Sequence, residues 1–119
     1  MSLQAYQKTQ RSTENSKQTE YRLFAQVTQA LIEAGKKGRA DIAGFIDALD
    51  WNRRLWSTLA TDCASGGNQL PPAVRAQIIS ISLWVSRYSS DAAQKGSSLE
   101  PLIDVNKSIM AGLSQRPAA

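Results

Sequence analysis

The sequence contains no histidine and a single cysteine among its 119 residues. Without histidine there is no Ser-His-Asp or Cys-His catalytic unit and no imidazole ligand for a metal. A lone Cys63 forms neither an internal disulfide nor a cysteine-rich zinc site. Because Cys63 is spaced like a core residue, and because free cysteines are commonly buried, we expect it in the core rather than as a reactive thiol.

Long apolar runs and a strong charge bias are also missing. No apolar stretch approaches the about 20 residues that span a membrane, and residues 1–11 are too polar for a signal peptide. We therefore expect a cytoplasmic protein without membrane insertion. The net charge of +4 is mild, and the basic residues Lys36, Lys37 and Arg39 lack interleaved aromatics. This pattern favours a solvated turn and disfavours direct RNA binding.

Patterns typical of catalysis are absent as well. The carboxylates are scattered without the spacing of a metal site or an acid–base pair. The glycine pairs are not followed by the Lys-Ser/Thr of a phosphate-binding loop. The sequence therefore predicts that the protein is not an enzyme and holds no cofactor and no metal.

Glycine and proline instead divide the chain into long segments whose apolar residues recur at spacings of three and four. Such stripes predict helices, and each stripe needs a neighbour to be buried. The expected helices cover residues 13–34, 40–64, 72–95 and 101–111. Short loops between long helices predict an all-α, single-domain, mostly antiparallel bundle of about four helices.

The two ends of the chain lack this apolar pattern. We expect residues 1–12 to form a polar N-terminal arm or a short helical extension, and residues 114–119 to form a flexible tail. The helical domain is then expected to cover residues 13–113.

Apolar residues outside the main stripes are the first candidates for a binding surface. At about 100° per residue, Ile79 and Leu83 point nearly opposite the main stripe of helix 72–95, and Trp84 lies on its flank. Either this helix is central and covered by its neighbours, or it offers a second face to a partner. Trp51 lies about 120° from the core stripe of helix 40–64, with Leu55 nearer the edge of that stripe. Trp51 either packs on the bundle or contacts a partner.

Two asparagines, Asn52 and Asn106, interrupt apolar stripes. A buried amide needs hydrogen-bond partners and often fixes the register of packed helices. We therefore favour a structural role for both over contact with a ligand.

Four segments carry a resemblance to a known family. They are WNRRLW at 51–56, LPPAVRAQIIS at 70–80, WV at 84–85 and LIDVNKSIMAGL at 102–113. On these segments the chain resembles the FlaF family of bacterial flagellar biosynthesis proteins. The resemblance implies a small cytoplasmic factor needed for flagellin production and filament assembly, with no catalytic residues. Family members are associated with positive control of flagellin synthesis, opposed to the translation repressor FlbT, and with binding flagellin before export.

The resemblance leaves the direct activity open, and the physics of helix docking favours flagellin binding. A helical bundle with spare apolar surface can hold an amphipathic terminal segment of flagellin, as an export chaperone or assembly factor does. The alternatives are a regulator acting on flagellin mRNA or through FlbT, and a structural subunit of a larger complex. The expected apolar anchors are Trp51, Leu55, Ile79, Leu83 and Trp84, with Arg54 and Arg75 orienting the partner. Oligomeric state is left open.

Overall fold

The computed structural model describes the backbone of residues 2–114 and the side chains of residues 2–4 and 20–112. This part of the chain is helical and contains no strand, so the all-α prediction is confirmed. Its elements are α1 (Leu3–Lys37), the 3-10 helix η1 (Gly38–Asp41), α2 (Ile42–Ala64), α3 (Pro72–Lys95) and α4 (Glu100–Ser114). The expected tail lies, from residue 115 onward, outside the described residues.

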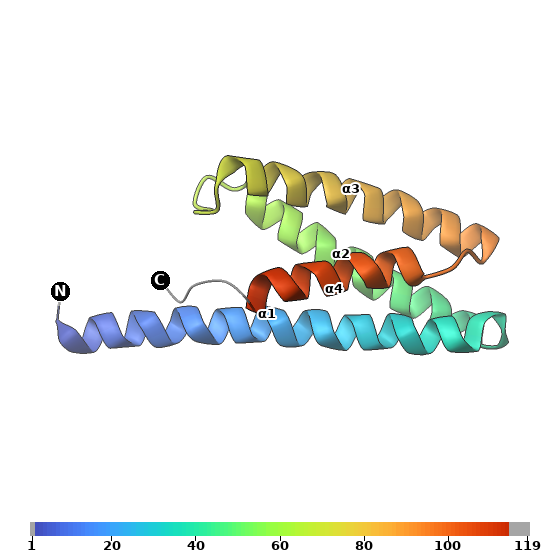
Figure 1. Cartoon of the computed structure of the whole chain (residues 1–119), viewed down its shortest axis with the longest axis horizontal. Coiled ribbons are helices and arrows are strands. Elements are labelled where there is room, and N and C mark those ends of the chain that lie inside the picture. Colours follow the sequence, from blue (N-terminus) through green and yellow to red (C-terminus); the bar gives the residue numbers. More distant parts are fainter. Residues whose placement is uncertain (1, 115–119) are drawn as a thin grey trace.

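The helix α2 occupies the centre of the fold (Figure 1). It packs against both α1 and α3, while α4 packs along α1. The reading of helix 72–95 as the central helix is therefore wrong, because α3 packs mainly on α2 and leaves Leu83 56% exposed. The N-terminal part of α1 extends beyond the ends of the other helices (Figure 1).

The first helix begins at Leu3, well before the expected start near residue 13. Residues 3–12 are continuous with α1, which agrees with the helical extension, one of the two alternatives expected for this segment. The reason is local: this segment contains neither glycine nor proline, and most of its residues, including three glutamines, are good helix formers. The start of the apolar stripe therefore does not mark the start of α1, because a helix can begin before any of its side chains is buried.

The turns are determined by a few residues with special backbone or capping roles. Asp41 caps α2, where its Oδ1 accepts a hydrogen bond of 3.1 Å from the backbone N–H of Gly44. Pro72 occupies the first turn of α3, and Gly96 ends that helix in the left-handed region at φ 67°. The observed bounds of α3 are those expected from the sequence, because both of its ends carry such a signal.

The core lies where α1, α2 and α4 meet and continues between α2 and α3. The Phe24 and Trp56 rings pack edge to face, with centroids 5.6 Å apart. Cys63 is buried in the same core, which confirms its expected place. Other buried members are Leu31, Leu49, Ile78, Val85, Ala92, Leu99, Leu102 and Ile103. None of the described helices is long and apolar enough to cross a membrane.

Candidate partner-binding surfaces

The exposed anchors expected from the sequence lie on separate faces of the molecule. Trp51 is 36% exposed and lines a groove between α1 and α2. Trp84 is 37% exposed and packs on Tyr88, with ring centroids 5.3 Å apart. Leu83 precedes Trp84 by one residue and so points about 100° away from it. A single bound helix cannot cover all three side chains.

The other two expected anchors contribute to the core. Leu55 on α2 and Ile79 on α3 are half-buried and pack against the buried cluster. Only part of each side chain is therefore available to a partner. The position of Leu55 near the edge of its apolar stripe indicates this partial burial, whereas Ile79 is expected nearly opposite the main stripe of its helix and is more buried than that position predicts.

The two expected orienting arginines have different surroundings. Arg54 is exposed and pairs with Asp50 one turn before it on α2, at 3.3 Å between Nε and Oδ2. Arg75 is half-buried in the first turns of α3, and its Nε–H is buried without a hydrogen-bond partner among the described residues. Arg54 can exchange its partner at small cost, because an exposed pair is worth at most about 1 kcal/mol.

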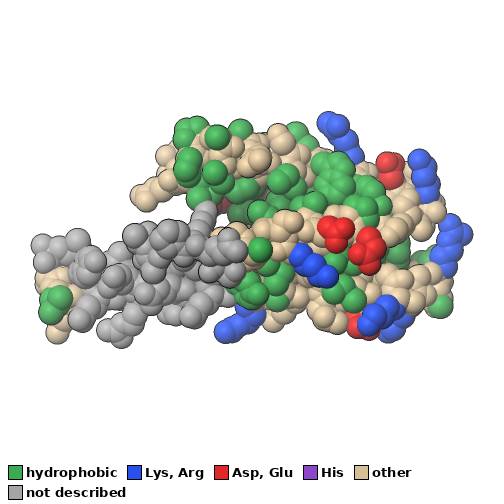
Figure 2. Space-filling model, in the orientation of Figure 1, with side chains coloured by type: hydrophobic (Ala, Val, Ile, Leu, Met, Phe, Trp, Pro, Cys, Tyr) green, Lys and Arg blue, Asp and Glu red, His purple; other side chains and the backbone are tan. Residues whose placement is uncertain are grey.

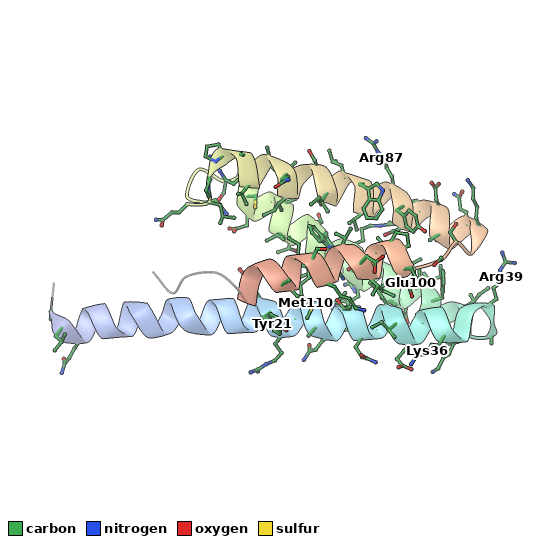
Figure 3. All side chains as sticks on the ribbon, viewed as in Figure 1. Tyr21, Lys36, Arg39, Arg87, Glu100 and Met110 are labelled. Atoms are coloured by element: carbon green, nitrogen blue, oxygen red, sulfur yellow. The ribbon has the colours of Figure 1, made fainter. Side chains whose placement is uncertain are left out.

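The basic turn after α1 is partly engaged within the chain. Lys36 pairs with Glu33 at 3.6 Å, and the Nη2 of Arg39 donates to the carbonyl oxygen of Lys95 at 3.3 Å. Figure 3 shows Lys36 and Arg39 near the end of α1, with Arg39 at the extremity of the fold. The Arg39 hydrogen bond joins η1 to the end of α3.

The two asparagines on apolar stripes meet in the core. The indole Nε1–H of Trp56 donates to Oδ1 of Asn106 at 2.8 Å, and Nδ2 of Asn106 donates to Oδ1 of Asn52 at 2.8 Å. All three side chains are fully buried. This chain of hydrogen bonds joins α2 to α4. Nδ2 of Asn52 and the buried Oγ of Ser89 have no hydrogen-bond partner within the described structure.

A groove of about 270 Å³ lies between α3 and α4. Its walls are Ile81 on α3 and Val105 and Ile109 on α4, and its polar edge is Asp104 and Ser108. Hydrophobic side chains gather on this side of the molecule, along α3 and between α3 and α4 (Figure 2). We call this cavity the α3–α4 groove.

The apolar wall of the α3–α4 groove continues along α3. Ile81, Trp84 and Tyr88 are spaced three and four apart and so share one flank of the helix. The Tyr88 hydroxyl donates to the carbonyl oxygen of Ser98, just before α4, so this flank faces α4. The sequence places Trp84 on the flank of the main apolar stripe of this helix, but it does not show which helix lies beside that flank.

A second groove, of about 240 Å³, lies between α1 and α2. Small residues form its floor, Trp51 stands at one end, and charged side chains surround it. We call it the α1–α2 groove. The residues that line it are Ala30, Glu33, Ala34, Lys37, Asp41, Gly44, Asp47, Ala48 and Trp51.

The fold and these surfaces define a small all-helical protein with open grooves along its helices. The sequence model of the family described as flagellar protein FlaF matches residues 2–113. Since this match covers nearly the whole chain, the protein belongs to the FlaF family. No curated protein and no solved structure matches it.

Proposed function

We propose that the protein binds newly made flagellin as an export chaperone or assembly factor and thereby promotes flagellin synthesis and secretion. Membership of a flagellar family supports the flagellar setting. The observation that carries the binding step is the α3–α4 groove, which is apolar and open. The exposed Trp84 lies one turn after the groove residue Ile81, on the same flank of α3.

The dimensions of the α3–α4 groove suit one helix. The flank from Ile81 to Tyr88 covers eight residues, or about 10 Å of helix axis between the first and the last, which matches about two turns of a bound amphipathic helix. The terminal segments of flagellin have this character, since they become helical in the filament and expose apolar surface before assembly. Apolar residues at spacings of three and four on such a segment would lie against Val105 and Ile109 on one side and Trp84 on the other.

If flagellin lies in the α3–α4 groove, only some of the anchors expected from the sequence can contact it. Trp84 adjoins the α3–α4 groove, whereas Trp51 lines the other groove and Leu83 points to the outer side of α3. Figure 3 shows the Arg87 side chain, one turn after Leu83, extending away from the other helices. We therefore assign flagellin docking to the Trp84 side and use Leu83 as the matched control.

Titration calorimetry with monomeric flagellin tests the proposal. We expect binding with a negative heat-capacity change and little dependence on salt, because apolar burial drives it. Trp84→Ala should weaken binding at least about tenfold, as loss of a large interface aromatic does. Leu83→Ala should leave binding unchanged. Both residues are exposed enough for the circular dichroism spectrum to stay the same.

Three results would contradict the proposal. If Leu83→Ala weakens binding and Trp84→Ala does not, flagellin does not occupy the α3–α4 groove. If flagellin gives no heat while its leader RNA binds with steep salt dependence, direct translational control replaces flagellin binding. If neither binds, FlbT or another protein is the partner to test next, and the flagellin-binding proposal is abandoned.

A further inference from the structure

We propose that the α1–α2 groove is a second docking site, which takes an arginine-bearing peptide segment of a partner protein. This surface is separate from the α3–α4 groove, since it is built by other helices and shares no lining residue with it. The proposal goes beyond flagellin binding and does not depend on it.

The shape of the α1–α2 groove comes from four small residues. Ala30 and Ala34 on α1 face Gly44 and Ala48 on α2, and each pair is four residues apart on its helix. Side chains this short leave a channel over the line where the two helices meet. From Gly44 to Trp51 the channel follows eight residues of α2, about 10 Å from the first to the last, enough for about three residues of extended peptide.

The charge of this groove is opposite to that of the whole protein. Three carboxylates line it, from Glu33, Asp41 and Asp47, against the single ammonium group of Lys37. The chain as a whole carries a net charge of +4. A local acidic channel on a basic protein attracts cationic groups and repels anionic ones. The occupant is therefore a basic segment.

Asp47 and Trp51 indicate arginine in particular. They are four residues apart on α2, so they are neighbours on one face of the helix. Asp47 forms no ion pair or hydrogen bond with the described residues, and the ring of Trp51 is not stacked on another described ring. A guanidinium group can pair with a carboxylate through two parallel N–H bonds and lie flat on an indole at the same time. An ammonium group lacks the planar shape that this double contact needs.

The other two carboxylates are less available. Asp41 is engaged in capping α2, and Glu33 accepts from Gln29 and pairs with Lys36. Asp47 is therefore the carboxylate that can pair with an incoming arginine. The remaining acidic groups add long-range attraction only.

The three tryptophans of the chain allow a direct test, because each reports on a different place. Trp51 lines the α1–α2 groove, Trp84 adjoins the α3–α4 groove and Trp56 is buried. In the ¹⁵N-labelled full chain, each indole N–H gives one NMR signal that a Trp→Phe variant assigns. We would titrate the capped peptide acetyl-Ala-Arg-Ala-amide, and the same peptide with lysine or with neutral citrulline.

We expect the Trp51 signal alone to shift and to saturate, most tightly with arginine, less with lysine and not with citrulline. Asp47→Asn should weaken arginine-peptide binding about threefold, the effect of losing one partly exposed charge pair. Asp50→Asn is the matched control, because Asp50 lies on the same helix and pairs with Arg54 outside the groove. It should leave the affinity unchanged.

Three results would overturn this proposal. The first is no shift of the Trp51 signal at millimolar arginine peptide, and the second is an equal response to citrulline. The third is self-association of the free protein, seen by sedimentation equilibrium, that Asp47→Asn abolishes, because a second copy would then fill the groove. A loss of flagellin binding to the Trp84 side leaves all three measurements unaffected, so the two proposals fail separately.

Discussion

Asn106 joins α4 to α2 through two side-chain hydrogen bonds, and its replacement by alanine tests what this buried network contributes. Its Oδ1 accepts from Trp56 and its Nδ2 donates to Asn52, each at 2.8 Å. Asn106→Ala removes both bonds and leaves the Trp56 N–H and the Asn52 oxygen buried without partners.

The expected loss of stability follows from these two orphaned groups. Each buried polar group left unpaired costs about 1–3 kcal/mol, and the truncated side chain adds a small cavity. We therefore expect Asn106→Ala to lower the free energy of unfolding by about 3–5 kcal/mol. For a domain of this size that corresponds to a fall in Tm of about 10–20 °C. Lys107→Ala, at the exposed neighbouring position on α4, should change stability by at most about 0.5 kcal/mol.

Urea unfolding followed by circular dichroism and by tryptophan fluorescence measures these differences. The double variant Asn52→Ala with Asn106→Ala supplies the sharper test. Each single variant orphans an atom of the other asparagine, and the double variant contains neither orphan. Its cost should therefore be smaller than the sum of the two single costs, by about 1–3 kcal/mol. Strict additivity, or an Asn106→Ala variant as stable as Lys107→Ala, would refute the reasoning.

Two further predictions concern the helix ends, and both use urea unfolding. Gly96→Ala should cost about 1–2 kcal/mol, because Gly96 has φ 67° and an added Cβ would approach the Arg39 guanidinium to 3.0 Å. Gly66→Ala, which meets open space, is its control and should be neutral; equal effects would contradict the argument. Asp41→Ala should cost about 1 kcal/mol by removing the N-cap of α2. Asp41→Asn should stay near the parent protein, and a loss as large as that of alanine would argue against capping.

The bounds of a helix are predicted well from the sequence where both of its ends have a terminating residue such as proline or glycine. Pro72 and Gly96 delimit α3, and the observed bounds agree with the expected ones. At the start of α1 the sequence gives no such signal, and the helix begins at Leu3 although no apolar stripe continues there. Helical backbone depends on propensity and on the absence of breakers, whereas a stripe reports only on packing.

The candidate surfaces were predictable in part. Helical geometry correctly placed Trp51, Leu83 and Trp84 away from the centre of the core, because angular position depends on sequence alone. It could not show which helix lies beside each of them. Trp51 faces a groove with α1, and Trp84 lies on the flank that faces α4. Which surfaces combine is decided by tertiary packing, and so the sequence could not show that the expected anchors Trp51 and Trp84 lie on separate surfaces.

The buried asparagine network connects the fold to the proposed flagellin site. Asn106 lies next to Val105 and one turn before Ile109, the two apolar walls that α4 contributes to the α3–α4 groove. An apolar residue at position 106 could be buried at several rotations of α4, since apolar contact has no direction. Two hydrogen bonds of fixed length and angle tolerate far less rotation. A turn of α4 by one residue, about 100°, would replace Val105 in the groove by a neighbour and break both bonds. The two hydrogen bonds of the Asn106 amide therefore help to fix which side chains of α4 face α3.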